Sequence, residues 1–328
     1  MDNAWIKRLL VASRMLRLAG KSGVAILTYH SVLEEPQRYA RWLGSNIHSA
    51  EIFRRQMEFV ARHYTPVTLD DVLSFLRGEK NLPPRAVAVT FDDGHADNFE
   101  IALPILNHVG VRATFYLTVD CIANAKLPWF VRLRHAFGVT ERKSWEEPDG
   151  TLWPLKDAAQ RESAFLAACD RCARLAGTSQ EDLVRSAERE LETETETPPG
   201  QLMMTWDQAR GLLRSGHAVG SHGLTHPNLA YVSESELNTE LAESKRKLEQ
   251  ELATQVVHFA YPGPALKPIW SQRSLELSRQ AGYQTAVIST GGLARRQNNP
   301  LCLPRVGPGD DVDGLRWNLE CTFLGRRM

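Results

Sequence analysis

The sequence predicts an α/β fold built from parallel βαβ units, because short apolar runs alternate with amphipathic segments along most of its 328 residues. The apolar runs at 24–30, 85–91 and 111–119 have the length and the branched residues of buried strands. The segments at 52–63 and 234–251 have apolar residues at helical spacing. Such alternation forms either a closed barrel or a doubly wound sheet, and single α/β barrels commonly reach this length.

The expected elements alternate from the first strand onward. The run at 24–30 is the first strand, and helices follow it at 52–63 and 73–76. In an α/β barrel the catalytic residues gather at the carboxyl ends of the strands, so chemistry is expected there. Further strands are expected at 85–91, 111–119, 217–221, 256–261 and 283–289, and further helices at 101–108, 206–213, 234–251 and 270–281.

Composition and charge fit an ordinary globular protein. Hydrophobic residues make up 43% of the chain and charged residues 24%, and 39 basic residues balance 39 acidic ones. No overall field therefore favours nucleic acid as a partner. Five scattered cysteines do not form a disulfide framework and indicate a reducing, cytoplasmic location. Cys169 and Cys172 have the spacing of a metal or redox pair, but their alanine-rich surroundings favour two ordinary helix thiols.

Residues 1–22 predict an amphipathic helix ahead of the main domain at 23–328. Basic residues such as Lys7, Arg8 and Arg14 interrupt its apolar residues, so the apolar run is too short for a signal peptide or a membrane span. Its apolar side either docks on the protein's own domain or lies on an anionic membrane surface. The second alternative would add peripheral membrane contact to the cytoplasmic location.

The segment at about 122–200 interrupts the alternation of strands and helices. It contains Trp129, Trp145 and Trp153, and it ends in an acidic run at 192–199 that is typical of a solvated linker. We expect one large insertion between two strands of the main domain. It forms either a lid or a docking surface.

Asp92 and Asp93 directly follow the strand expected at 85–91. Two adjacent carboxylates at the end of an apolar strand repel each other, and a bound cation is one way to compensate them. One aspartate is then a metal ligand and the other a general base. The alternative is a simple Asp-Gly turn.

His222 and His226 lie four residues apart, again at the end of an expected strand. Two histidines at this spacing project to one side of a helical turn and can share a metal ion. Two histidines and one aspartate leave coordination positions open, which a catalytic site requires and a structural zinc site does not.

A third motif, Tyr261-Pro262-Gly263, follows the strand expected at 256–261. A strand exit rich in proline and glycine is compatible with a mere turn. It is equally suited to present a backbone N–H to a developing oxyanion.

Together the three motifs resemble those of the polysaccharide deacetylases, the NodB-homology family also called carbohydrate esterase family 4. The sequences TFDDG, SHGLTH and AYPG follow the family's order. The resemblance covers roughly residues 24–121 and 202–306. It implies a distorted (β/α) barrel of about seven parallel strands with one large insertion.

The resemblance also implies roles for the residues of these motifs. Asp92 is expected to be the general base, and Asp93, His222 and His226 are expected to bind the metal. His95, just after the Asp-Gly turn, is a candidate for lining the pocket.

The sequence departs from the family pattern at the acid. No histidine follows His258, so the family's usual late Leu-x-His motif has no counterpart. The sequence LTYHSV at 27–32 is instead similar to the amino-terminal motif of the permuted poly-N-acetylglucosamine deacetylase subgroup. This similarity makes His30 the candidate acid and its neighbour Tyr29 a candidate substrate-binding residue. Arg305 is similar to the late arginine of that subgroup, which holds the base aspartate.

Two further departures concern glycines. Gly223 stands where the family usually has Ser or Thr, which implies a looser hydrogen bond behind a metal ligand. Gly263 and Pro264 stand where Tyr-Gly or Phe-Gly is common, so Tyr261, Pro262 and Gly263 remain joint candidates for the oxyanion and substrate site.

These features predict a metal-dependent hydrolase that removes N-acetyl groups from an N-acetylated sugar, glycan or glycan precursor by metal-activated water. Nitrogen and oxygen ligands favour Zn and also suit Co, Ni, Mn or Fe. Two alternatives share the motifs. One is a related C–N amide or O-acetyl ester hydrolase that acts on a non-polysaccharide substrate, and the other is a catalytically inactive glycan-binding protein.

Overall fold

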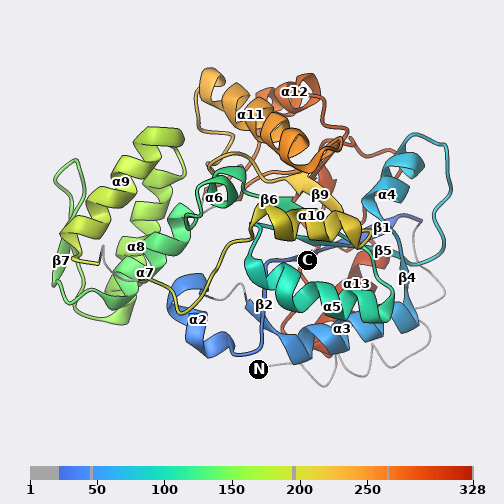
Figure 1. Ribbon diagram of the computed structural model, residues 1–328, viewed down its shortest axis with the longest axis horizontal. Helices are drawn as coiled ribbons and strands as arrows, with labels where there is room; N and C mark the ends of the chain where they lie inside the picture. The colour runs from blue at the N-terminus through green and yellow to red at the C-terminus, as the bar shows by residue number, and fades with distance from the viewer. Residues whose placement is uncertain (1–21, 45–46, 194–196, 264–265, 327–328) are drawn as a thin grey trace.

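A single parallel sheet rolls into a ring at the centre of the protein (Figure 1). The computed structural model describes residues 22–44, 47–193, 197–263 and 266–326. The strands of the sheet are β1 (Val24–Tyr29), β4 (Thr65–Pro66), β5 (Ala86–Phe91), β6 (Ala113–Leu117), β9 (Ala218–Ser221), β10 (His258–Ala260), β11 (Thr285–Ile288) and β12 (Leu303–Pro304). They are hydrogen-bonded in the order β1, β5, β6, β9, β10, β11 and β12, and β4 also pairs with β5.

The two ends of this sheet meet. Val306, just beyond β12, bridges Leu27 of β1 in parallel, and the amide of Thr28 donates to the carbonyl oxygen of Val306 at 3.1 Å. The described residues therefore form a nearly closed barrel of seven parallel strands, which confirms the predicted α/β barrel.

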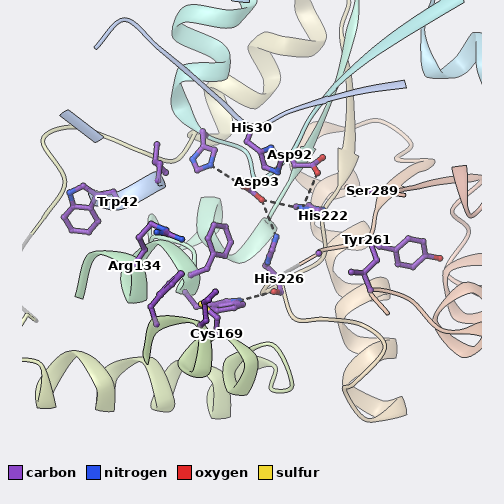
Figure 2. Close-up of a pocket in the computed structure, with 18 of the residues that line it drawn as sticks. His30, Trp42, Asp92, Asp93, Arg134, Cys169, His222, His226, Tyr261 and Ser289 are labelled. Carbon is purple, nitrogen blue, oxygen red and sulfur yellow. Dashed lines mark hydrogen bonds and ion pairs between the residues drawn. The ribbon is translucent and has the colours of Figure 1, made fainter. Parts of the chain in front are cut away.

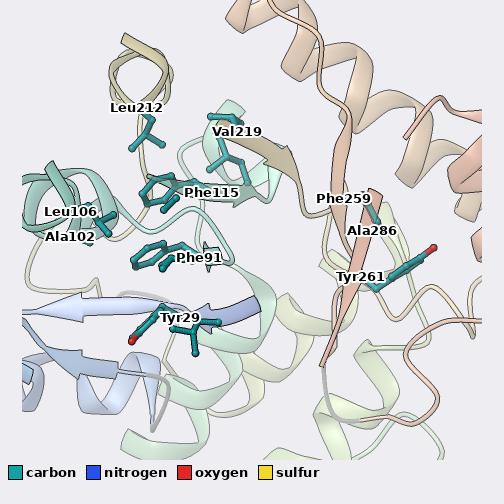
Figure 3. Packing of buried hydrophobic residues seen from close by; sticks show 14 of the residues in the cluster. Tyr29, Phe91, Ala102, Leu106, Phe115, Leu212, Val219, Phe259, Tyr261 and Ala286 are labelled. Atoms are coloured by element: carbon teal, nitrogen blue, oxygen red, sulfur yellow. The ribbon is translucent and has the colours of Figure 1, made fainter. Parts of the chain in front are cut away.

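The strands are apolar throughout because both faces of the sheet are covered. Every residue of β5 and of β6 is buried. On the outer face, the rings of Tyr29, Phe91 and Phe115 stack in a row, with successive centroids 5.5 and 4.8 Å apart (Figure 3). On the inner face, Ile26 and Ala88 belong to a separate cluster that fills the ring.

Helices cover the outside of the ring (Figure 1). They are α3 (Ala50–His63), α4 (Leu69–Leu76), α5 (Leu103–Val109), α10 (Trp206–Arg214), α11 (Glu234–Leu252), α12 (Gln272–Gln280) and α13 (Val312–Phe323). Both α10 and α11 begin at a capping box, formed by Thr205 with Gln208 and by Ser233 with Glu236. The helices predicted at 206–213 and 234–251 therefore start at the expected residue.

The structure also contains elements that apolar spacing did not predict. The helix expected at 101–108 begins earlier, as a π-helical turn, η2 (Asn98–Ala102), which leads into α5. Strands of three residues are too short to show a period, and this explains why the small second sheet was missed. Outside the insertion, the other unpredicted elements are β2 (Ser31–Leu33), β3 (Ile47–Ser49), β4, β12, α2 (Pro36–Leu43), α6 (Val119–Ala123) and α13.

The part of the chain from Trp129 to Glu190, between β6 and β9, forms a lobe beside the barrel (Figure 1). It consists of α7 (Trp129–Val139), the hairpin β7 (Ser144–Glu146) and β8 (Leu152–Pro154), α8 (Ala158–Cys172) and α9 (Gly177–Glu190). The lobe has its own apolar cluster around Phe137, Trp145 and Phe165. Cys169 and Cys172 are buried in α8, and burial raises the pKa of the Cys172 thiol to about 12, so both behave as helix thiols.

The amino-terminal helix expected at 1–22 lies outside the described residues, which begin at Ser22. Among the residues that the structure does describe, no helix combines the length and the apolar character that crossing a bilayer requires.

Candidate metal centre and active-site cavity

The carboxyl ends of the barrel strands meet in one cavity of about 380 Å³. Predicted residues that follow strands line it, among them His30 after β1, Asp92 and Asp93 after β5, His222 after β9 and Arg305 after β12. Figure 2 shows His30, Asp92, Asp93 and His222 grouped at one side of this cavity. Chain segments that are far apart in the sequence are thus brought together by the geometry of the barrel.

Asp93, His222 and His226 direct their ligand atoms toward a common centre. Oδ1 of Asp93 is 3.4 Å from Nε2 of His222 and 3.4 Å from Nε2 of His226. Two ligands about 2.1 Å from one ion at a tetrahedral angle are separated by roughly 3.4 Å, so this spacing fits a zinc-like divalent cation. All three residues are buried, and one ligand atom from each lies within 4.8 Å of the others. Two nitrogens and one carboxylate oxygen leave coordination positions open.

The surroundings of the two histidines determine how each faces this centre. Nδ1 of His222 lies 2.8 Å from the carbonyl oxygen of Ala260, to which it donates, and this leaves the lone pair of Nε2 for a metal. His226 has a φ of +64°, in the left-handed region that residues other than glycine rarely adopt. Backbone strain of this kind persists where surrounding contacts hold it, and it is common at functional sites.

Asp93 is ionised by its contacts. Its φ of +73° is also left-handed, and its second oxygen, Oδ2, lies 3.4 Å from Nε2 of His95. Burial raises the pKa of the Asp93 carboxyl, but the contacts with His222, His226 and His95 outweigh burial and hold the pKa well below its usual value. His95 therefore lines the cavity and orients the carboxylate from the side away from the other two histidines.

Asp92 forms a buried, bidentate ion pair with Arg305. The two guanidinium nitrogens Nη1 and Nη2 donate to Oδ1 and Oδ2 of Asp92, each at 2.6 Å. Burial raises the pKa of the Asp92 carboxyl, while the charge of Arg305 lowers it, and the net result is a lowered pKa. Asp92 is therefore a carboxylate at neutral pH, and Arg305 fixes the plane of that carboxylate.

His30 reaches the cavity from the end of β1. Its carbonyl oxygen accepts a hydrogen bond from Nδ2 of Asn98 at 2.6 Å. Asp97 holds the next two residues, since it accepts from the hydroxyl of Ser31 at 2.5 Å and from the amide of Val32 at 2.8 Å. Burial lowers the pKa of the His30 ring, and the charges of the two neighbouring aspartates oppose this only in part.

The candidate substrate and oxyanion residues are distributed differently from the prediction. Tyr29 lies in the outer apolar layer, where its hydroxyl donates to Oε1 of Gln56 at 2.9 Å, so it does not reach the cavity. The side chain of Tyr261 points away from the cavity (Figure 2), and its amide donates to the carbonyl oxygen of Val287 at 3.2 Å. Pro262 has no N–H. Of the three motif residues, only Gly263 therefore keeps a backbone N–H at the cavity without a sheet partner.

The insertion and α2 together supply the opposite wall of the same cavity. Figure 2 shows Trp42, Arg134 and Cys169 on the side away from Asp92 and His222. The wall is mainly apolar and is made by α2, α7 and α8. Its residues are Trp42, Leu43, Trp129, Phe130, Arg134, Phe165, Leu166 and Cys169. The insertion, which we expect to be a lid or a docking surface, therefore lines the site.

Two buried residues outside the motifs hold the loop that carries His226. Glu240 of α11 accepts from the amides of Leu224 at 2.7 Å and Thr225 at 3.0 Å. Nε1 of Trp129 in α7 donates to the carbonyl oxygen of His226 at 3.0 Å. Gly223, the departure noted in the sequence, has a φ of +81° and lies beside this carboxylate, so a side chain there would be strained. No motif or spacing in the sequence indicates either contact.

Comparisons with known proteins agree with this architecture. The family model described as polysaccharide deacetylase matches residues 79–286, which is more than half of the chain. YxkH of Bacillus subtilis (strain 168), whose name places it among the polysaccharide deacetylases, is 20% identical over 298 residues, covering 88% of this chain and 72% of YxkH.

Solved structures show the same fold. The deacetylase PplD of Streptococcus pyogenes, solved in complex with acetate, has a TM-score of 0.60 at 18% identity, and the alignment covers 90% of this chain and 98% of PplD. IcaB from Ammonifex degensii has a TM-score of 0.59 at 18% identity, covering 92% of this chain and 98% of IcaB.

Proposed function

The chain belongs to the polysaccharide deacetylase family, and on that premise we propose that it hydrolyses the acetamide of an N-acetylated carbohydrate with a divalent metal held by Asp93, His222 and His226. The observation that carries this proposal is the buried cluster of these three ligands next to a carboxylate, Asp92, that Arg305 keeps ionised. A ligand set and a separate base in one cavity are what metal-assisted hydrolysis requires.

The metal site is proposed from its donors. A divalent cation bound there supplies Lewis-acid polarisation of the acetyl carbonyl and of a water molecule. Two imidazole nitrogens and one carboxylate oxygen favour Zn, and Co, Ni, Mn and Fe accept the same donors. Metal analysis of the purified protein identifies which one the chain retains.

The protein's own residues move the protons. Asp92 accepts a proton from the attacking water as the water oxygen bonds to the acetyl carbon. The carbon–nitrogen bond then breaks, and His30 donates a proton to the nitrogen, so that the products are acetate and a free amine. His30 lines the same cavity at the end of β1, and its protonated form is the proposed donor of this proton.

Gly263 is the proposed backbone donor to the developing oxyanion. The amide of Tyr261 is used within the sheet and Pro262 has no N–H, which leaves Gly263 in this motif. A backbone donor of this kind contributes to the rate only if it is directed at the oxyanion, and the sheet hydrogen bond of Tyr261 fixes the strand that leads to it.

The test measures acetate release from chitooligosaccharides and poly-N-acetylglucosamine fragments, before and after removal of metal by a chelator. The Asp92→Asn protein is expected to retain metal and to lose at least about 100-fold in kcat, while His222→Ala loses both metal and activity. Full activity of Asp92→Asn would remove this residue from the base role. Release of acetate from O-acetyl esters alone would favour an esterase, and glycan binding without hydrolysis by metal-loaded protein would indicate an inactive binding protein.

A further inference from the structure

The cavity has more positive charge than the acetamide chemistry uses. Among the described residues that line it, the carboxylates are Asp92 and Asp93, and the cations are Arg134, Lys267 and Arg305. Both terminal guanidinium nitrogens of Arg305 donate to Asp92. A divalent metal at Asp93 would make the cavity more positive still. Two cations therefore remain without a function in the proposed reaction.

Arg134 keeps most of its hydrogen-bonding capacity for a ligand. Its guanidinium lies over the ring of Phe165, 4.2 Å from the ring centroid, which fixes it against the wall. Its ion pair is with Glu162, at 3.6 Å, and the Glu162 side chain is 53% exposed, so the pair is weak. Figure 2 shows Arg134 across the cavity from Asp92. A planar guanidinium in this position suits an anion with several oxygens.

Lys267 supplies a second cation from the barrel side. It lies between β10 and α12 and lines the same cavity. Lys267 is exposed, and in the part of the chain that the structure describes no hydrogen bond or ion pair engages its ammonium. Arg134 from the insertion and Lys267 from the barrel therefore give one anion a positive group from each side.

An apolar surface accompanies these cations. Leu166 of α8 lines the cavity and is 50% exposed, one of two large hydrophobic side chains that are exposed among the described residues. Phe130 and Phe165 continue this surface into the cavity. Exposed apolar area inside a binding cavity is stabilised by an apolar ligand. A neutral sugar chain can stack on the rings, but it has no anion for the two cations and no aliphatic chain for Leu166.

We propose that the substrate is an N-acetylated sugar whose anomeric phosphate is esterified to an apolar alcohol, with the phosphate between Arg134 and Lys267 and the alcohol on the surface formed by Phe130, Phe165 and Leu166. This inference rests on the proposed deacetylase function. It assigns the insertion to recognition of the group attached to the sugar, and the barrel to the acetamide.

The experiment compares kcat/KM for substrates that differ in one group at a time. They are methyl N-acetyl-α-D-glucosaminide, N-acetyl-α-D-glucosamine 1-(methyl phosphate) and N-acetyl-α-D-glucosamine 1-(farnesyl phosphate), the last used below its micelle concentration. The methyl phosphate is expected to exceed the neutral glycoside by at least about tenfold. The farnesyl ester is expected to exceed the methyl ester by a further tenfold or more. Uridine diphosphate N-acetylglucosamine, which has phosphate but no apolar alcohol, should resemble the methyl ester.

Variants test which residues produce each difference in kcat/KM. Arg134→Gln and Lys267→Gln are expected to reduce the ratio of phosphate to neutral substrate to near one. Lys156→Gln, an exposed cation of the insertion away from the cavity, should leave that ratio unchanged. Leu166→Ser should remove the farnesyl advantage, and Leu152→Ser, the other exposed leucine at 64%, should not.

The outcomes are separable. Equal kcat/KM on the neutral and phosphorylated substrates would overturn the inference while leaving the deacetylase function in place. A phosphate advantage that persists in both cation variants would also overturn it. A uridine diphosphate sugar that is preferred over the farnesyl ester would overturn the assignment of the apolar surface. No acetate from any substrate by metal-loaded protein would count against the proposed function itself.

Discussion

The barrel and the insertion line one cavity with different chemistry. The barrel side has most of the charged and titratable groups, and several of them directly follow a strand, such as Asp93 after β5 and His222 after β9. The insertion side has mostly rings and aliphatic side chains on α7 and α8, with Arg134 among them. Strand ends in a closed sheet hold their side chains at fixed separations, and this suits bond-making groups. A helical wall can change its side chains without disturbing those separations, and this suits selection of the substrate.

The two regions also differ in how they use arginine–carboxylate pairs. In the barrel, Arg305 and Asp92 are both buried and have each other as their charged partner. In the insertion, Arg132 contacts Glu181 and Glu188, and all three side chains are 15–22% exposed. Removing one partner of a buried pair leaves an uncompensated charge, whereas a partly exposed pair can be replaced by water.

The largest effect is expected from Arg305→Gln. The variant leaves the Asp92 carboxylate buried without its partner, so the free energy of unfolding should fall by about 3 kcal/mol or more. Arg132→Gln in the insertion should cost about 1 kcal/mol. Chemical denaturation of both variants measures the difference. The Asp92→Asn/Arg305→Gln double variant should recover part of the loss, and equal destabilisation of the Arg305 and Arg132 variants would show that burial does not separate the two regions.

A smaller effect is expected from Glu240→Gln. The amide offers one acceptor oxygen where the carboxylate offers two, so the loop from Gly223 to His226 loses part of its support. The affinity for Zn²⁺, measured by competition with a chelator, should fall by about 30-fold. Glu249→Gln is the matched control, because Glu249 lies on the same helix and accepts from the amide of Val256 instead. An unchanged Zn²⁺ affinity in the Glu240 variant would remove it from the support of the ligand loop.

Trp129→Phe tests whether the insertion contributes to the metal centre at all. The variant keeps a ring on the wall but loses the hydrogen bond to the carbonyl oxygen of His226. We expect about tenfold weaker Zn²⁺ binding. Trp153→Phe removes an indole hydrogen bond of the same kind, to Glu147 on the far side of the insertion, and should leave Zn²⁺ affinity unchanged. If both variants bind Zn²⁺ like the parent, the insertion is a wall only.

Much of the barrel side follows from the sequence, because the strands are apolar runs and the ligands occur in short motifs next to them. Side chains alternate between the two faces of a strand, and this alternation in β1 already predicts that Tyr29 points outward. Leu27 and Tyr29 lie in the outer layer, while Ile26 faces the interior. We predicted Tyr29 at the substrate from its neighbour His30, and this was wrong because His30 lies beyond the strand end, where alternation stops.

The supports and the wall did not follow from the sequence. Glu240 lies in α11 among many charged residues that read as a solvated helix face, and only the packing of α11 on the His222–His226 loop buries it. Trp129 and Arg134 lie in a segment without motifs. Their relation to the metal ligands depends on where the lobe sits, and no local pattern encodes that placement.

The smallest effect on stability is expected at the amino-terminal end of β9, opposite the end that carries His222. His217 precedes this strand, and its Nδ1 accepts from the amide of Ala113 at 3.1 Å. Burial, helped by the charge of Arg112, lowers the pKa of His217 to about 4. The unfolded chain binds the proton with an ordinary pKa of about 6.5, so this residue destabilises the fold as the pH falls from 6.5 toward 4, and has no such effect above 6.5.

Replacement of His217 by glutamine, which keeps an acceptor for Ala113, should therefore reduce the loss of stability between pH 7.5 and pH 5 by about 1 kcal/mol. Denaturant titrations at the two pH values measure this. Parallel losses in the parent and in His217→Gln would assign the acid sensitivity to other groups. His217, which lies at the opposite end of β9 from His222, would then not be a source of the acid sensitivity.

The pair of Asp92 with Arg305 has a consequence for how the molecule is made. The two residues are 213 positions apart, and the same late segment contributes Val306, which joins β12 to β1. During synthesis, the aspartate emerges long before the arginine that neutralises it. Closure of the ring and neutralisation of the buried carboxylate therefore depend on the same short segment, so a change that displaces residues 305–306 would affect both at once.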